Sequence, residues 1–322
     1  MIKSLLSGMC IVANALLMMP AHAQKYPERP ITLIVPFAAG SAATIVYRLV
    51  AETIKAELGQ PVVLEILPGA AGLVGLEKGR RAPSDGYTLV GSSDAILIYP
   101  PLLLKSATFD PLTDFEPISM IASVDWVLVA HSSFPAQNLQ DVIKAVKADP
   151  NTTYSSGGFG SGQHVGMEYF AQRAGITMRQ IPYKGITPAL TAVAGNEVSL
   201  MLTSIATSLP FIKEGRLRAI AVPSAVRSTQ LPDVPTFIEA GLPGFEFGSW
   251  ISMSAPLKVS QDKIELIQRA IAKSMADPAI RAQLLTAGLT PVGSTPDEMR
   301  RRLTSDNRKL TDLVRSLGIK PE

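Results

Sequence analysis

The chain has 322 residues, of which 47% are hydrophobic, and its 30 basic and 27 acidic side chains leave a formal net charge of +3. This length and composition are enough for one large or two medium globular domains with a substantial core. The small net charge, the absence of a basic block and an aromatic fraction of 6% argue against a nucleic-acid-binding protein.

The first 23 residues have the composition of a cleavable secretory signal. A basic start at Lys3 precedes an apolar stretch from Leu5 to Met19, and Ala21-His22-Ala23 forms a small-x-small cleavage site before Gln24. The apolar stretch is shorter than the roughly 20 residues that span a bilayer. We therefore expect export to the periplasm with cleavage near Ala23/Gln24. The single cysteine, Cys10, lies in this leader, so no disulfide is expected in the mature chain.

Two segments near the start of the mature chain share one construction, an apolar strand followed by a loop of small residues that opens a helix. The first is Ile31 to Thr44, whose helix should end at Gly59, and the second is Val62 to Gly75. Small residues let a ligand approach the backbone, and the first N–H groups of a helix have no intrahelical partner. The pair could hold a carboxylate without arginine or lysine. The alternative is two ordinary strand-to-helix turns.

Strands and helices continue to alternate along the chain. Further strands are predicted at Thr88 to Val90, Thr153 to Ser156, Val198 to Leu202 and Arg218 to Val222. A glycine-rich loop, 157–162, separates one of them from a helix over about Gln163 to Ala174. This alternation predicts an α/β fold with mainly parallel sheets flanked by helices. After residue 260 the spacing predicts helices rather than another sheet.

Polar side chains follow several of these strands. Ser92 and Ser93 come after the strand at Thr88 to Val90, and Thr203 and Ser204 come after the strand at Val198 to Leu202. Ligands of open α/β sheets bind at the carboxyl ends of the strands, so these residues are candidate ligand contacts. The alternative is an ordinary turn or helix cap, and the same choice applies to Ser41 and Thr44 at the first helix start.

Neither catalysis nor metal binding is indicated. Ser161 and His164 are close in sequence, but no Gly-x-Ser-x-Gly elbow and no evident orienting acid accompany them. The mature chain has two histidines, His131 and His164, and no thiolate or Asp-rich loop at ligand spacing. We expect no cofactor, no metal and no enzymatic activity.

Several phrases, taken in order, resemble the Bug-type periplasmic solute receptors of tripartite tricarboxylate transporters. They are Tyr26-Pro27-Glu28-Arg29-Pro30, Gly59-Gln60-Pro61, Asp85-Gly86-Tyr87-Thr88-Leu89, Pro182-Tyr183-Lys184-Gly185 and Leu231-Pro232-Asp233-Val234-Pro235-Thr236. The resemblance runs from Tyr26 to about Leu317.

This resemblance implies a type II periplasmic-binding-protein (Venus flytrap) fold with the ligand in a cleft between two domains. Domain 1 would comprise 24–124 and 250–322, and domain 2 would comprise 125–249. The hinge crossings would lie within 118–130 and 245–255. It also implies capture of a small organic acid, commonly a dicarboxylate or an amino acid, and delivery of the closed form to a membrane permease. We expect a monomer.

The resemblance adds contacts from the second domain, because Gly160, Ser161 and His164 are similar to the family's Gly-x-x-x-His stretch and Tyr183 looks like a cleft residue. A histidine bonded only to its own loop is the alternative. The full set of candidate ligand-binding residues is Phe37, Ala39, Gly40, Ser41, Ala42, Thr44, Gly69, Ala70, Ala71, Gly72, Ser92, Ser93, Gly160, Ser161, His164, Tyr183, Thr203 and Ser204.

Departures from the family pattern bear on the ligand. Ser41 and Thr44 stand where the family usually has paired glycines and an aspartate, and Ile66-Leu67 stand where it usually has Asn-Arg. The missing aspartate argues against an amino acid, and Ile66-Leu67 favour a carboxylate with a hydrophobic or aromatic body. The alternative is that Ile66 and Leu67 face the core and do not touch ligand. An amino-acid or amide binder, and a receptor that feeds a sensor kinase, stay open as alternatives.

Overall fold

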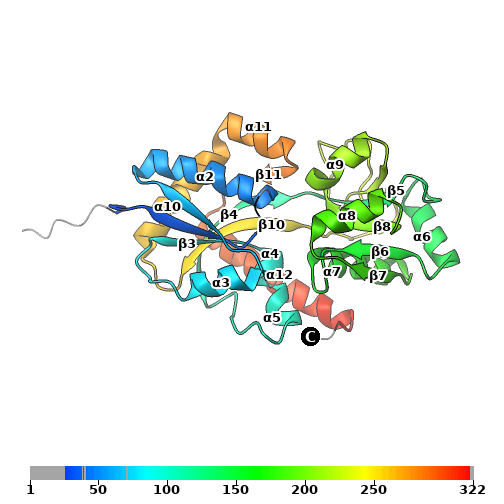
Figure 1. Cartoon of the computed structure of the whole chain (residues 1–322), viewed down its shortest axis with the longest axis horizontal. Helices are drawn as coiled ribbons and strands as arrows, with labels where there is room; N and C mark the ends of the chain where they lie inside the picture. The colour runs from blue at the N-terminus through cyan, green and yellow to red at the C-terminus, as the bar shows by residue number, and fades with distance from the viewer. Residues whose placement is uncertain (1–25, 38, 40, 70–71, 320–322) are drawn as a thin grey trace, which may run out of the picture.

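The computed structural model describes residues 26–37, 39, 41–69 and 72–319. The signal predicted at 1–23 and the candidate residues Gly40, Ala70 and Ala71 lie outside the described residues, as does the side chain of Ala42. The described chain forms two β-sheets side by side along the long axis of the molecule, each flanked by helices (Figure 1). No helix of this part of the chain is both long and apolar enough to cross a bilayer.

The first sheet has the strand order β11-β4-β10-β3-β1-β2. Its strands are β1 (Ile31–Val35), β2 (Val62–Ile66), β3 (Thr88–Ser93), β4 (Phe115–Val124), β10 (Ser249–Pro256) and β11 (Leu289–Pro291). Its helices are α2 (Ala42–Leu58), α3 (Leu73–Arg80), α4 (Asp94–Leu97), α5 (Tyr99–Leu103), α10 (Gln261–Ala276), α11 (Pro278–Thr286) and α12 (Pro296–Ser316). We call this sheet with its helices the first lobe.

The second sheet has the strand order β7-β6-β8-β5-β9. Its strands are β5 (Trp126–His131), β6 (Thr153–Ser156), β7 (Arg179–Pro182), β8 (Leu200–Ser204) and β9 (Leu217–Ala221). Its helices are α6 (Leu139–Ala148), α7 (Gly162–Ala174), α8 (Ile186–Ala194) and α9 (Ile205–Lys213). This sheet with its helices is the second lobe.

The elements follow the local chemistry of the chain. In β1 every residue except Thr32 is buried, as expected for a strand covered on both faces. Helix α2 begins at the predicted cap Ser41 and ends at Gly59, whose φ of 75° closes the helix with a bond from its N–H to Lys55 O. The predicted strand at 31–35 and the predicted end of this helix are confirmed.

The chain passes between the lobes at two neighbouring places. Asp125 alone separates the end of β4 from the start of β5, and the chain returns through 223–248 into β10. Ser249, the first residue of β10, pairs in register with Val124, the last residue of β4. Asp125 lies within the predicted crossing segment 118–130, and the last part of the return, before Ser249, lies within 245–255. That these segments act as a hinge stays a prediction.

The sheets are mixed rather than mainly parallel. The pairs β1–β2, β1–β3, β6–β7 and β6–β8 are parallel, whereas β4, β5 and β10 pair antiparallel with their neighbours. Strand β10 runs against β3 and β5 runs against β8, whereas β4, being antiparallel to β10, has the same direction as β3. The alternation alone did not indicate these reversed strands. The short β11 also joins the first sheet, in a region where only helices were predicted.

Helix α12 contacts both lobes, and its red ribbon in Figure 1 lies along the crossing strands and ends beside the second lobe. The Trp250 indole N–H donates to Asp306 Oδ2 at 2.8 Å, and Gln172 Nε2 of α7 donates to the Ser316 carbonyl at 3.3 Å. One cluster of buried apolar side chains draws on both lobes, including Leu103 and Val165. The lobes therefore share part of their core near the chain crossings.

Candidate ligand-binding cleft

The ends of the two sheets face each other across the chain crossings. Trp126, the first residue of β5, pairs with Ser204 at the carboxyl end of β8. In the first lobe, Ser93 at the carboxyl end of β3 pairs with Ile251 near the start of β10. Because β4 leads into β5 within one residue, these two ends lie on facing sides of the interlobe boundary. Carboxyl ends of parallel strands are the usual position of ligands in α/β sheets.

The first predicted loop brings Ser41 and Thr44 together at the start of α2. Ser41 Oγ accepts the Thr44 N–H at 3.3 Å and lies 2.8 Å from Thr44 Oγ1. Thr44 is buried, Ala39 is exposed, and the half-buried Phe37 ring packs 6.2 Å from that of Tyr47. Ser41 therefore caps α2, which is the role that we considered as the alternative to ligand binding.

The second predicted loop is shaped by two glycines with positive φ. Gly69 has φ 126° and Gly72 has φ 91°, and the Gly72 N–H donates to Gly69 O at 2.9 Å. A Cβ on Gly72 would lie 2.7 Å from Ile96 Cγ2, so only glycine fits against α4 here. No side chain caps α3, which begins directly after Gly72. Gly72 therefore offers no side-chain acceptor to the first N–H groups of α3.

The structure places Ser92 and Ser93 inside β3 rather than after it. Ser92 is fully buried, and its hydroxyl lies 2.8 Å from the equally buried Ser252 Oγ. Ser93 is also buried and caps α4 by accepting the Ile96 N–H at 3.3 Å. The prediction that the strand ends at Val90 is wrong. Since the Ser92 hydroxyl is engaged inside the sheet, Ser92 is no longer a good candidate for ligand contact.

The glycine-rich loop of the second lobe holds His164 in one protonation state. Burial lowers the pKa of His164 to about 4, so the imidazole is neutral near pH 7. Its Nδ1 accepts the Gly160 N–H at 3.1 Å, which leaves the proton on Nε2. Ser161 caps α7 through the His164 N–H and donates its hydroxyl to Gly158 O at 2.8 Å. His164 therefore does bond to its own loop, as in the alternative that we considered from the sequence.

The same loop lies against the first lobe. A Cβ on Gly160 would lie 3.1 Å from Leu103 Cδ1 of α5, and a Cβ on Gly162 would lie 3.0 Å from Trp126 Cη2 and 3.8 Å from Tyr99 Cε2. Small residues at 160 and 162 therefore permit a close approach of α7 to α5 across the interlobe boundary.

The remaining candidates lie at the carboxyl edge of the second sheet. Tyr183 follows β7 and donates its N–H to Ser156 O at 3.0 Å. Thr203 and Ser204 belong to β8 and do not follow it, contrary to the prediction. Thr203 is fully buried, 3.3 Å from Thr207 Oγ1, while the half-buried Ser204 caps α9 through the Thr207 N–H. Both residues lie at the carboxyl end of β8, and the burial of Thr203 was not predicted.

Comparison with known proteins identifies the chain. The family model "Tripartite tricarboxylate transporter family receptor" matches residues 46–319. The chain belongs to this receptor family. The receptor is 34% identical over 311 residues to protein BugT of Bordetella pertussis (strain Tohama I), covering 96% of this chain and 95% of BugT.

Solved structures resemble the whole fold of this receptor. Rpa4515 of R. palustris, solved with adipate, has a TM-score of 0.85 at 29% identity, covering 92% of this chain and all (100%) of that one. MatC of Rhodopseudomonas palustris, solved with bound malate, has a TM-score of 0.80 at 26% identity and covers 90% and 100%. The expected two-domain periplasmic-binding-protein fold is confirmed, and the family consists of periplasmic solute-binding receptors.

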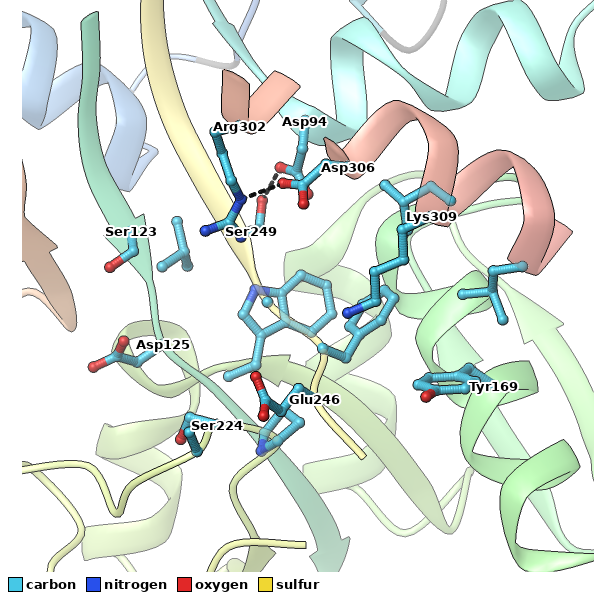
Figure 2. Close-up of a pocket in the computed structure, with 18 residues that line it drawn as sticks. Asp94, Ser123, Asp125, Tyr169, Ser224, Glu246, Ser249, Arg302, Asp306 and Lys309 are labelled. Atoms are coloured by element: carbon cyan, nitrogen blue, oxygen red, sulfur yellow. Dashed lines mark hydrogen bonds and ion pairs between the residues drawn. The ribbon is translucent and has the colours of Figure 1, made fainter. Parts of the chain in front are cut away.

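The receptor also has a cavity of about 250 Å³ where the chain crosses between the lobes, which sequence reasoning did not predict (Figure 2). We call it the hinge cavity. It is lined by Asp94, Ser123, Val124, Asp125, Trp126, Tyr169, Pro223, Ser224, Ala225, Glu246, Phe247, Gly248, Ser249, Arg302, Asp306, Lys309, Leu310 and Leu313. These residues come from both crossings, the second lobe and α12, and no motif links them. Among the described residues, no cluster of three or more His, Cys, Asp or Glu side chains could hold a metal.

Proposed function

We propose that this receptor captures a small organic carboxylate between its lobes and delivers it to the membrane permease of a tripartite tricarboxylate transporter. The observation that carries the proposal is that Gly72, which precedes the first residue of α3, gives this helix no side-chain cap. Free helix N–H groups and the helix dipole attract a carboxylate. The relatives solved with adipate and malate, both dicarboxylates, support the same class of ligand.

A second helix start, in the other lobe, supports carboxylate binding between the lobes. Helix α8 begins after Gly185 with no side-chain cap, directly beyond Tyr183 at the carboxyl end of β7. A dicarboxylate could therefore meet one uncapped helix start from each lobe. The proposed contacts are the two loops, the half-buried Ser41 and Ser161 at their helix caps, His164 through its Nε2–H, and Tyr183.

The body of the ligand is proposed to be apolar, with Leu67 as the principal contact in the first lobe. Ile66 packs against the core around α2 and β1, as our alternative for this residue held. Leu67 belongs to none of the three apolar core clusters and is half-buried. In the second lobe, Ile186 is 39% exposed and Phe159 lies beside His164. These side chains favour a hydrophobic or aromatic acid over a small polar one.

The hydrogen bonds of Ser161 and His164 also favour a binding role over catalysis. The Ser161 hydroxyl donates to Gly158 O, and His164 Nδ1 accepts from the Gly160 backbone. Neither atom is available to form the nucleophile-to-base hydrogen bond that acyl transfer requires.

We further propose that the moving bodies are 24–124 with 250–322 and 125–249. The passage of β4 into β5 at Asp125 and the start of β10 at Ser249 support these limits. Closure about these crossings around the ligand would produce the form that the permease recognises. We propose that the receptor acts as a monomer.

The test is a thermal-shift screen of the mature protein, starting at Gln24, against dicarboxylates, aromatic acids, amino acids and sugars. A ligand that binds only the folded state at 100 times its Kd stabilises it by about 2.7 kcal/mol, which corresponds to roughly 5 °C in Tm. We expect such shifts for carboxylates with an apolar body. Shifts for amino acids alone would show that the missing aspartate was misread, and shifts for sugars alone would overturn the carboxylate proposal.

The variant Leu67→Ala refines this test. It should lower the affinity for acids with a large apolar body and leave the affinity for short dicarboxylates nearly unchanged, because only the apolar body reaches Leu67. Ile66→Val is the matched control, since Ile66 packs in the core. Equal effects of the two variants on ligand affinity would contradict a contact with Leu67.

A further inference from the structure

The first crossing between the lobes is bonded to both of them through the backbone of one residue. Asp125, which alone separates β4 from β5, donates its N–H to Gly288 O of the first lobe at 3.4 Å. The Asp125 carbonyl accepts the N–H of Ile205, the first residue of α9 in the second lobe, at 2.9 Å. The backbone of a single residue therefore attaches the crossing to a fixed point in each lobe.

The main chains of the two lobes touch at the same point, where α11 and α9 both lie above the crossing strands (Figure 1). Gly288 follows α11 with φ 71°, and a Cβ on it would lie 2.7 Å from Ala206 N and 2.9 Å from Ala206 Cβ in α9. The Ala206 N atom belongs to a helix, so rotation of a side chain cannot relieve such an overlap. Close by, Gln230 Nε2 of the second lobe donates to Thr286 O of α11 at 3.1 Å. Glycine at 288 is therefore required for the lobes to pack this closely.

Two other places at the lobe boundary are less tightly packed. A Cβ on Gly160 would lie 3.1 Å from Leu103 Cδ1, which is the end of a flexible side chain. At the second crossing, a Cβ on Gly248 would have no atom within 4 Å beyond its chain neighbours. When the lobes rotate, the side-chain contact at Gly160 can change and the chain at Gly248 has room to move. The main-chain contact at Gly288 is the one of these three that stays in place.

We propose that Gly288 and Ala206 form the pivot about which the two lobes rotate, and that the backbone dihedral angles of Asp125 absorb the rotation. This proposal rests on the proposed function, because the rotation is the closure of the cleft around its ligand. Packed contacts resist continuous deformation, so a sub-ångström change at a pivot becomes a larger movement at the far ends of the lobes. Gly288 is thus a positioning residue, which touches no ligand but sets how the two halves of the cleft face each other.

The test measures the distance between two spin labels, one in each lobe, in the ligand-free mature chain. The single cysteine of the sequence lies in the predicted signal, so Lys55→Cys in α2 and Lys147→Cys in α6 supply two exposed labelling sites. Gly288→Ala adds a methyl group at the pivot and should shift the mean label distance by about 2 Å or more. Ala206→Leu enlarges the same contact from the other lobe, without a positive φ, and should shift the distance in the same direction.

Gly215→Ala is the matched control for Gly288→Ala. Gly215 lies beyond the other end of α9 with φ 70°, and a Cβ on it would have no atom within 4 Å. The control therefore has the same unfavourable φ without the overlap, and it should leave the label distance unchanged. Isothermal titration with adipate gives the second readout. Both pivot variants should lower the affinity for adipate at least fivefold, and Gly215→Ala should change it less than twofold.

Two results would overturn the proposal. If the pivot variants keep the label distance of the control, the contact does not set the angle between the lobes. If the distance shifts but both variants bind adipate as tightly as the wild type, the contact does not position the cleft. A wild-type receptor that binds no carboxylate contradicts the proposed function, while the label distances of the ligand-free chain still decide whether the contact is a pivot. Thermal melts show which variants fold, and Ala206→Leu decides the outcome if Gly288→Ala does not.

Discussion

At the scale of single residues, Gly72 joins backbone conformation to packing. Its φ of 91° is unfavourable for any residue with a side chain, and a Cβ would lie 2.7 Å from Ile96 Cγ2. Gly59 has a similar φ of 75°, but no atom lies within 4 Å of where its Cβ would be. The two positions therefore separate backbone strain from steric overlap.

We predict that Gly72→Ala destabilises the receptor by about 2–4 kcal/mol and that Gly59→Ala costs only about 1 kcal/mol. In both variants the positive φ is unfavourable for alanine, and in Gly72→Ala the new Cβ also overlaps with Ile96. Urea denaturation of the mature chain measures both. Gly72→Ala should also lower the affinity for the ligand of the cleft, whereas Gly59→Ala should leave this affinity unchanged. Equal losses of stability would mean that Ile96 moves aside and that the loop is not tightly packed.

At the scale of elements, the helix starts around the cleft divide into two kinds. Helices α2, α7 and α9 begin with Ser41, Ser161 and Ser204, whose side chains accept a backbone N–H of the first turn. Helices α3 and α8 begin after Gly72 and Gly185 without a side-chain cap. The uncapped helices have more N–H groups available for an anion, which is why the proposed carboxylate contacts centre on them.

Helix α12, which lines the hinge cavity, begins with a capping box. Thr295 Oγ1 accepts the Glu298 N–H at 3.2 Å, and the Glu298 carboxylate accepts the Thr295 N–H at 2.8 Å. Thr295→Ala removes the first bond and should cost about 1 kcal/mol, or about 2 °C in Tm. Ser260→Ala is the control, because Ser260 caps α10 without a side-chain bond. A loss for Ser260→Ala as large as that for Thr295→Ala would contradict this account.

At the scale of the whole molecule, each lobe contains a buried titratable group, and the two shift in opposite senses. Burial raises the pKa of Asp94 in the first lobe to about 6 from its ordinary 3.8, and the nearby Asp306 carboxylate adds to the increase. Burial lowers the pKa of His164 in the second lobe to about 4 from 6.5. The stability that Asp94 contributes is complete below pH 3.8 and is lost as the pH rises through 6. The contribution of His164 is complete above pH 6.5 and is lost as the pH falls through 4.

Between pH 4 and 6 these two contributions should largely cancel, each changing the free energy of unfolding by up to about 3 kcal/mol. We predict that the stability of Asp94→Asn rises with pH across this window, because only His164 still titrates. The stability of His164→Gln should fall as the pH rises across the same window, because only Asp94 still titrates. Urea denaturation at a series of pH values measures both, and the double variant supplies the baseline for all other groups. Parallel profiles for the two single variants would contradict the opposite shifts.

Much of the fold was predictable because it depends on neighbours in the chain. The apolar run 31–35, the serine caps and Gly59 each act within a few residues, so periodicity and residue type were sufficient. The same local reasoning failed where the direction of a side chain mattered. Ser92 and Thr203 are polar residues near strand ends, yet both are fully buried in the sheets, since a strand that ends two or three residues later than predicted changes which residues remain exposed.

The sequence by itself determined the α/β alternation, the two small-residue loops between strand and helix, and the family. Only the tertiary structure decided that the crossing strands pair antiparallel, that Ile66 packs in the core while Leu67 does not, and that a cavity exists at the hinge. Trp126, Glu246 and Lys309 lie far apart in the chain, and their meeting depends on strand register and on how α12 packs across both lobes. Such contacts arise from the packing of whole elements, and no local pattern of residues encodes them.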